Sequence, residues 1–332
     1  MSHTMSQASP APTPAPPPPA RFAIVDVARG IALLAMFVFH FAYDLSHFNL
    51  IETDVPFEPG WRLFARLIAG SFLTLVGISL VLATRRGLDR RAYLKRLAMV
   101  AGAALAVTIG TRIAMPANFI FFGILHHIAL ASVIALPLLR LPAAALAAGA
   151  VAAFALPSFV AADWLDAPWL SWLGFSRAPL YTADFVPVFP WFGCVLTGMA
   201  LAKLALPRLS GTRLARWRPA LPPVRLVAWG GRHSLLVYLL HQPVFIGLIL
   251  LAMQAGLSPP GEEAPFLSSC QRSCARPDLT AQTCERLCTC TVESLKRADL
   301  WRKVLANNLS PAENERMTGL ARACFTAQEP RP

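Results

Sequence analysis

The first apolar segment of the chain contains four residues that could take part in proton transfer and anion binding: Asp26, Arg29, His40 and Asp44. Arg29 and His40 are eleven residues apart. On an α-helix this spacing is three turns plus about 20°, so both side chains share one face and lie about 16 Å apart along the axis. Asp26 is one turn from Arg29 and could pair with it. Asp44 is one turn beyond His40 and could hold a nitrogen of its ring.

These four residues have a structural interpretation and a functional one. The structural interpretation is an ion pair that anchors the start of a helix, together with a histidine bonded to a neighbouring helix. The functional interpretation is a guanidinium that binds an anion and an imidazole that accepts a proton. Because ionisable groups are costly inside an apolar segment, above all if that segment spans a membrane, their alignment on one face favours the functional interpretation.

A second polar stripe lies in the last apolar segment, where Ser234, Tyr238 and His241 recur at positions i, i+4 and i+7. Arg232 precedes the stripe, and Pro243 follows it and could kink the helix beside His241. The stripe could line a site, with Tyr238 supporting an oxyanion, or it could form hydrogen bonds between helices. The sequence supports both interpretations equally.

A pair of adjacent histidines, His126 and His127, lies in a middle apolar segment. On a helix their side chains point about 100° apart, so at most one of them faces a given site. Neither an i, i+4 spacing nor a third ligand accompanies them, which argues against a metal. We expect one of the two to form structural hydrogen bonds.

Six of the seven cysteines lie in the last part of the chain: Cys270, Cys274, Cys284, Cys288, Cys290 and Cys324. An i, i+4 pair places both sulfurs on one helix face, so two such helices joined near Pro277-Asp278 could face each other as a hairpin. Antiparallel pairing then predicts the disulfides Cys270–Cys288 and Cys274–Cys284, which leaves Cys290 for Cys324. A zinc site is the main alternative, although Cys288-x-Cys290 is tight for tetrahedral ligation and no histidine lies nearby. A reactive redox hairpin is a third.

The composition indicates which fold must position these residues. Of the 332 residues 55% are hydrophobic and only 14% are charged, and the mean hydropathy is +0.51, whereas soluble domains have about 25% charged residues. This composition excludes a soluble enzyme, a disordered chain and a coiled coil, and it predicts an all-α, polytopic transmembrane helix bundle. We predict about seven spans, at residues 27–45, 62–84, 96–115, 117–139, 143–162, 187–206 and 233–254.

The basic residues set the expected orientation. The 85–96 and 207–225 loops are rich in arginine, whereas the 46–60 and 163–186 loops are mainly acidic. Because cytoplasmic loops carry an excess of Lys and Arg, the N-terminus is expected in the cytoplasm and the C-terminus in the periplasm. An even number of cysteines in a polar region on the oxidising side fits disulfides better than a metal.

Three regions are expected along the chain. Residues 1–20 form a proline-rich, disordered leader without the features of a secretory signal. Residues 21–256 form the transmembrane domain, and 257–332 form a periplasmic, cysteine-rich helical tail. Within the tail, Ser310 and Glu313 have the spacing of a capping box, which predicts the start of a last helix.

Four stretches resemble a known family. DVARGIALLAMFVFHFAYDL, at 26–45, resembles the first span of the transmembrane acyltransferase superfamily, whose signature is Arg-x10-His. FGILHHIALASV, YTADFVPVFPWFG and GRHSLLVYLLHQPV, at 122–133, 181–193 and 231–244, are similar to other recurring blocks of one branch. That branch is bacterial, has no assigned function, and resembles the catalytic domain of heparan-α-glucosaminide N-acetyltransferase. The resemblance covers roughly 20–250 and neither the leader nor the tail.

The resemblance implies an acyl-CoA-dependent N- or O-acyltransferase of the bacterial inner membrane, without a metal. It would move an acyl group, expected to be acetyl, from cytoplasmic acetyl-CoA to a saccharide or other envelope acceptor outside. The animal enzyme is expected to have its catalytic histidine in the first luminal loop, so His47 stands beside His40 as a candidate, and we favour His40. The catalytic candidates are His40, Asp44, His47, Tyr238 and His241, and the donor-binding candidates are Asp26, Arg29, His127 and Arg232.

Two other classes of protein stay open. A proton-coupled small-molecule transporter also places His, Asp and Arg in its spans, although an odd number of spans and no inverted repeat argue against it. A non-catalytic scaffold would use the spans only to present the cysteine-rich tail. The expected partners are the lipid bilayer, acyl-CoA and a carbohydrate or envelope acceptor. A homo-oligomer is left open, and nucleic acid is not expected.

Overall fold

The computed structural model describes residues 22–48, 50–51, 53–160, 162–177, 182–209, 211–255, 263–274, 279–305 and 309–326. Within these ranges the chain is helical, without a β-strand, and an isolated bridge joins Arg85 to Gly87. The predicted all-α class is therefore confirmed. The predicted leader at 1–20 and the predicted turn at Pro277-Asp278 lie outside the described residues.

Five helices of the described part are long and apolar enough to cross a membrane: α1 (Ala23–His47), α2 (Pro59–Thr84), α3 (Arg90–Ala114), α6 (Val188–Leu209) and α9 (Ser234–Gln254). They contain 21 to 26 residues each, and about 20 residues are needed to span the hydrocarbon core. These helices correspond to five of the seven predicted spans, and the chain is a multi-pass membrane protein.

Two further apolar helices are shorter: α4 (Ile124–Leu138) with 15 residues and α5 (Ala143–Phe159) with 17. The prediction of a helix over 117–139 is wrong in its first residues, because the backbone before Gly123 is bonded elsewhere. Ile120 accepts from the Thr108 hydroxyl at 2.7 Å and donates to the Thr111 hydroxyl at 3.0 Å. Side chains of α3 thus satisfy backbone groups that a helix would otherwise pair.

Shorter helices connect these elements. η1 (Asp163–Asp166) and η2 (Pro168–Leu173) lie between α5 and α6, and α7 (Arg213–Arg216) and α8 (Pro222–Arg232) lie between α6 and α9. α8 was not expected. Its residues 222–225 belong to the predicted loop 207–225, and the others lie between that loop and the predicted span at 233–254. Its first residue, Pro222, is tolerated because the first helical N–H needs no intrahelical partner.

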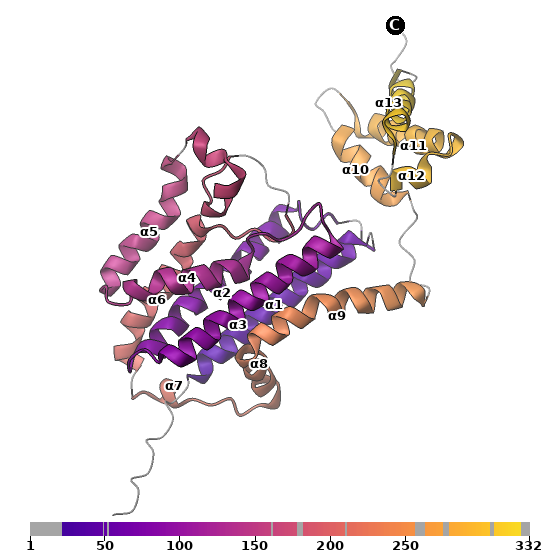
Figure 1. Ribbon diagram of the computed structural model, residues 1–332. Helices are drawn as coiled ribbons and strands as arrows, with labels where there is room; N and C mark the ends of the chain where they lie inside the picture. The colour runs from indigo at the N-terminus through magenta and orange to yellow at the C-terminus, as the bar shows by residue number, and fades with distance from the viewer. Residues whose placement is uncertain are drawn as a thin grey trace, which may run out of the picture. The chain divides into compact units, whose positions relative to one another are not determined.

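Contacts divide the chain into two compact units. The first unit comprises the chain up to Leu33 together with Ala69–Val237, and the second comprises Leu34–Ile68 together with the chain from Tyr238 onward. In the first unit α5 packs along α6 and α3 along α4 (Figure 1). The helices α1 and α2 each contribute one part to each unit.

Within the first unit α1 and α8 cross with their backbones in close approach. A Cβ atom built on Gly231 of α8 would lie 1.8 Å from the carbonyl oxygen of Asp26, and one built on Gly30 of α1 would lie 2.1 Å from that of Val227. Glycine at both positions removes the side chain that would hold the helices apart. The crossing therefore fixes Arg232, the next residue of α8, beside α1.

Replacing Gly231 with alanine should lower the unfolding free energy by about 1–3 kcal/mol, because the new methyl group forces the two backbones apart. The neighbouring Gly230→Ala variant is a matched control, since nothing lies within 4 Å of a Cβ built there. Thermal unfolding of the purified full chain would compare the two. Equal melting temperatures for both variants would contradict the close crossing.

The cysteine-rich tail is held by three disulfides in the second unit. Cys270–Cys288 and Cys274–Cys284 join α10 (Ala264–Cys274) to α11 (Ala281–Arg297), and Cys290–Cys324 joins α11 to α13 (Pro311–Thr326). The first two are the pairs that antiparallel hairpin spacing predicts, and the third joins the two cysteines that this pairing leaves over. A small core of Val292, Leu295, Leu300 and Trp301 lies beneath them, the last in α12 (Trp301–Leu305).

The predicted capping box at the start of the last helix is confirmed. The Ser310 hydroxyl accepts from the Glu313 N–H at 3.3 Å, and the Glu313 carboxylate accepts from the Ser310 N–H at 2.9 Å. These reciprocal bonds satisfy two backbone donors that the first turn of α13 leaves free.

Candidate functional site

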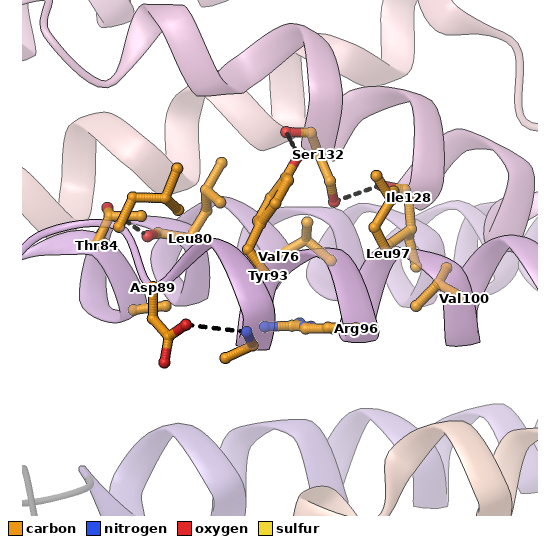
Figure 2. Close-up of a pocket in the computed structure, with 13 residues that line it drawn as sticks. Val76, Leu80, Thr84, Asp89, Tyr93, Arg96, Leu97, Val100, Ile128 and Ser132 are labelled. Carbon is orange, nitrogen blue, oxygen red and sulfur yellow. Dashed lines mark hydrogen bonds between the residues drawn. The ribbon is translucent and has the colours of Figure 1, made fainter.

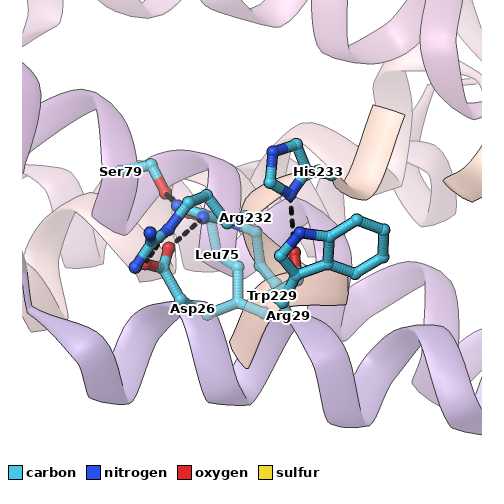
Figure 3. Close-up of polar contacts among 7 residues, drawn as sticks. All are labelled: Asp26, Arg29, Leu75, Ser79, Trp229, Arg232 and His233. Carbon is cyan, nitrogen blue, oxygen red and sulfur yellow. Dashed lines mark hydrogen bonds and ion pairs between the residues drawn. The ribbon is translucent and has the colours of Figure 1, made fainter. Parts of the chain in front are cut away.

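The first cluster of functional candidates lies where α1 meets α2 and α8, and we call Asp26, Arg29, Ser79 and Arg232 the Asp26 cluster (Figure 3). Arg29 donates to Asp26 Oδ1 at 2.9 Å, the pairing expected from their spacing. Its other terminal nitrogen donates to Ser79 Oγ of α2 at 2.7 Å, and the Ser79 hydroxyl in turn donates to the Leu75 carbonyl. Arg29 therefore joins α1 to α2 through a chain of hydrogen bonds.

Arg232 approaches the same carboxylate from α8. Its Nε lies 3.7 Å from Asp26 Oδ2, and its side chain is half exposed while Asp26 is 8% exposed. His233 follows as the C-cap of α8, and its Nδ1 lies 2.9 Å from the Trp229 carbonyl oxygen (Figure 3). One buried carboxylate thus faces two guanidinium groups, so the Asp26 cluster has a net positive charge.

The second cluster contains two histidine rings, one from α1 and one from α9, that meet edge-on. The rings of His40 and His241 have their centroids 4.9 Å apart at an angle of 62°. Phe37 stacks on His241 at 5.8 Å, and Phe245 meets it edge-on at 5.9 Å. We call His40 and His241 the histidine pair. The sequence placed both residues among its candidates but did not predict their contact.

The hydrogen bond of His241 fixes the position of its proton. Nδ1 lies 2.5 Å from the carbonyl oxygen of Tyr238. Because a carbonyl can only accept, Nδ1 must carry the hydrogen, and in the neutral ring Nε2 is then an acceptor. This Nε2 is buried and has no hydrogen-bond partner among the described residues. The ring therefore presents an unused base beside His40.

Asp44 has a different partner from the one expected. It is 2% exposed, and its Oδ1 accepts from Gln242 Nε2 of α9 at 2.5 Å rather than from the ring of His40. Asp44 Oδ2 and Gln242 Oε1 are buried and unpartnered within the described part of the chain. Buried polar atoms are usually satisfied, so these two acceptors mark a place for a group that donates hydrogen.

His47 lies at the last residue of α1 and is exposed. Its ring stacks on Tyr43 at 6.3 Å and meets Phe48 edge-on at 5.4 Å. These contacts place it seven residues beyond His40, at the end of the helix, and its ring contacts do not include His241. Among the described residues His47 therefore has no ring contact with either member of the histidine pair.

The adjacent histidines of α4 both form local hydrogen bonds. His127 is 1% exposed, and its Nδ1 lies 3.2 Å from the carbonyl oxygens of Val186 and Pro187. His126 accepts from the Gly123 N–H at 3.2 Å, and its Nε2 lies 3.0 Å from the Thr108 hydroxyl. Both rings tie α4 to its neighbours, and the Nε2 of His127 is buried without a hydrogen-bond partner among the described residues.

Asp184 caps α4 from a distant segment. Its Oδ2 accepts from the Ile124 N–H at 2.8 Å, at the helix start where a negative charge is favourable. A Cβ built on Gly123 would lie 2.3 Å from that oxygen, so glycine makes room for the cap. Burial raises the pKa of Asp184 to about 6, while the hydrogen bond from Ile124 opposes the shift.

Asp184→Ala should lower the unfolding free energy by about 1–2 kcal/mol through loss of the cap, whereas Asp184→Asn keeps an acceptor and should be tolerated. Because the pKa in the folded protein exceeds the usual 3.8, the folded form holds its proton more tightly. The stability of the wild type should therefore fall as the pH rises from about 4 to about 6. Melting curves across this range should show the dependence in the wild type and not in Asp184→Asn. A decline of the same size in both would exclude Asp184 as its source.

Apolar helices that enclose buried carboxylates, guanidinium groups and a histidine pair define a multi-pass membrane protein with acid–base groups inside its helix bundle. The family model "Heparan-alpha-glucosaminide N-acetyltransferase, catalytic" matches residues 21–243. The chain belongs to this family, which is of the membrane acetyltransferase type. No curated protein matches the chain significantly. No solved structure matches it significantly either.

Sequence reasoning missed two participants in these clusters, Ser79 and Gln242. Ser79 is a lone hydroxyl in a long apolar helix, where it would ordinarily bond its own backbone, and nothing local distinguishes it. Gln242 had a signal, because an amide in the middle of an apolar span is rare and it lies directly beside His241.

Proposed function

We propose that the protein transfers an acetyl group from cytoplasmic acetyl-CoA to an amine or hydroxyl of a saccharide or other envelope acceptor on the periplasmic side of the bacterial inner membrane. The observation that carries this proposal is the histidine pair, with the unpartnered Nε2 of His241 beside His40. Membership of an acetyltransferase family supports the class of reaction.

In this proposal the histidine pair supplies the general base. A neutral imidazole takes the proton of the acceptor as its nitrogen or oxygen attacks the carbonyl carbon of the thioester. The carbon–sulfur bond breaks, and the leaving thiolate of CoA receives that proton from the imidazolium. The open acceptors on Asp44 and Gln242 would hold the hydrogens of the attacking group, and Tyr238 would support the oxyanion.

A covalent relay is the alternative route for the same overall reaction. His40 would first attack the thioester, and the acetyl-imidazole would then pass its acetyl group to the acceptor. Incubation with acetyl-CoA alone, followed by mass spectrometry, separates the routes. A stoichiometric acetyl group on His40 supports the relay, and its absence during turnover supports direct attack.

The arginine-rich loops support the proposed orientation, with the start of α1 toward the cytoplasm. Arg29 is engaged with Asp26 and Ser79 in the Asp26 cluster, so it serves mainly to hold α1 against α2. Arg232 is half exposed and keeps its donor-binding role in the proposal.

The test is acetyl transfer by the purified full chain in detergent or nanodiscs, with acetyl-CoA as donor and glucosamine as a first acceptor. Release of the CoA thiol that depends on the acceptor, together with acetylated product, would support the proposal. Failure to bind acetyl-CoA would overturn it. Uptake of the sugar into proteoliposomes without acetylation would instead identify a transporter.

A further inference from the structure

A pocket of about 170 Å³ opens among α2, α3 and α4 in the first unit. Figure 2 shows that its lining side chains come from all three helices and from the turn before α3. Most of the lining is apolar, and its polar residues are Thr84, Asp89, Tyr93, Arg96 and Ser132. In the structure α3 begins at Arg90, within the arginine-rich 85–96 segment that the sequence analysis took for a loop. The proposed orientation therefore places this pocket near the cytoplasm.

Most of these polar groups already have partners. Tyr93 donates to the Ser132 carbonyl at 3.1 Å, and the Thr84 hydroxyl donates to the Leu80 carbonyl at 2.8 Å (Figure 2). Asp89 caps α3 by accepting from the Ala92 N–H at 3.1 Å. They leave Arg96 as the pocket's cation.

Arg96 is a cation without a carboxylate partner. None of the ion pairs among the described residues includes it, although Asp89 lies at the same pocket. Its side chain is exposed, so the guanidinium is open to a ligand. A guanidinium presents a planar fork of five donors, which matches the oxygens of a phosphate.

The surroundings of Arg96 increase the demand for an anion. The charge of Arg29 acts unfavourably on Arg96, and Arg29 and Arg232 both face the single carboxylate of Asp26. Arg96 therefore lies in a region where arginine side chains outnumber the carboxylates that pair with them. Positive charges that repel one another are stabilised when an anion binds to one of them.

The size of the pocket limits what it can hold. Sites for drug-sized ligands occupy about 300–1,000 Å³, so a pocket of about 170 Å³ accommodates a phosphate and the atoms next to it. A whole nucleotide would have to extend out of the pocket, toward the proposed cytoplasmic side.

We propose that Arg96 binds a phosphate of the acyl-CoA donor in the pocket formed by α2, α3 and α4. Arg29 then acts as a positioning residue that holds the Asp26 cluster together through Asp26 and Ser79. This inference rests on the proposed function. It assigns donor recognition to a residue that was not among the sequence candidates.

The experiment compares equilibrium binding of acetyl-CoA and of S-acetylpantetheine, which lacks the nucleotide and its phosphates, to the purified full chain in phosphatidylcholine nanodiscs. Arg96→Gln should weaken acetyl-CoA binding about ten- to hundredfold and leave acetylpantetheine binding unchanged, because one charge-assisted contact is lost. Arg96→Lys should recover part of the affinity, since an ammonium keeps the charge but not the fork. If Arg96→Gln fails to fold, the loss of affinity in Arg96→Lys decides the question.

Lys95→Gln is the matched control, because it removes the same charge from the adjacent exposed residue of α3, which is not part of the pocket lining. An equal loss of affinity in Lys95→Gln and Arg96→Gln would reduce the effect to general electrostatics and overturn the proposal. Unchanged acetyl-CoA binding in Arg96→Gln would also overturn the proposal. If phosphatidylglycerol added to the nanodiscs stabilised the wild type and not this variant, the pocket would be assigned to a lipid. A wild type that binds no acetyl-CoA would instead reject the proposed function itself.

Discussion

Replacing His40 with alanine is expected to reduce acetyl transfer about 10²- to 10⁴-fold, because this is the range that a general base contributes. The ring of His40 lies against His241, whose Nε2 is buried and unpartnered within the described residues. Acetyl-CoA binding should be nearly unchanged, since the substitution removes a reacting group rather than a phosphate contact. Turnover and donor affinity, measured on the same preparation, provide the two numbers.

The competing candidate is His47, and the same assay decides between the two. His47→Ala should retain near-normal turnover, because the residue is exposed at the end of α1 and stacks on Tyr43. Loss of activity in His47→Ala with normal turnover in His40→Ala would reverse the assignment. His241→Ala should resemble His40→Ala if the two rings act as one unit.

Removing the Cys290–Cys324 disulfide should destabilise the tail by about 4 kcal/mol on the chain-entropy model. This bridge closes the longest of the three loops, with a sequence separation of 34 against 18 and 10 for the others. The core beneath it is small, so little else compensates. The double variant Cys290→Ser/Cys324→Ser should therefore make the tail sensitive to trypsin under conditions where the wild type resists.

Cys194→Ser is the control for this prediction. Cys194 is a free, partly buried cysteine of α6, outside the tail. Its replacement should leave the protease sensitivity of the tail unchanged, and a reductant should reproduce the effect of the double variant. A tail that resists trypsin equally with and without reductant would show that the bridges contribute little to its stability.

The sequence predicted well whatever depends on local periodicity. Length and hydrophobicity located the long helices, and the i, i+4 spacing of Cys270 and Cys274 led to the same pairs that the structure has. The spacing of Asp26 and Arg29 also led to their ion pair. Each of these inferences needs only the geometry of one helix or of two helices in a hairpin.

The sequence failed where a partner comes from a distant part of the chain. It predicted a hydrogen bond between Asp44 and the ring of His40, whereas Asp44 accepts from Gln242, which lies 198 residues away in the chain. It extended α4 to residue 117, because it could not know that Thr108 and Thr111 would bind the backbone of Ile120. Such contacts depend on which helices pack together, and hydrophobic periodicity does not contain that information.

One helix of the tail, α11, contributes a cysteine to every bridge: Cys284, Cys288 and Cys290. The helices α10 and α13 are therefore both linked covalently to α11. A single protease cut between Cys270 and Cys288, or between Cys290 and Cys324, would release no fragment, because a bridge spans each segment. The nicked protein would migrate as a single band on a non-reducing gel, and its fragments would separate only after the disulfides were reduced.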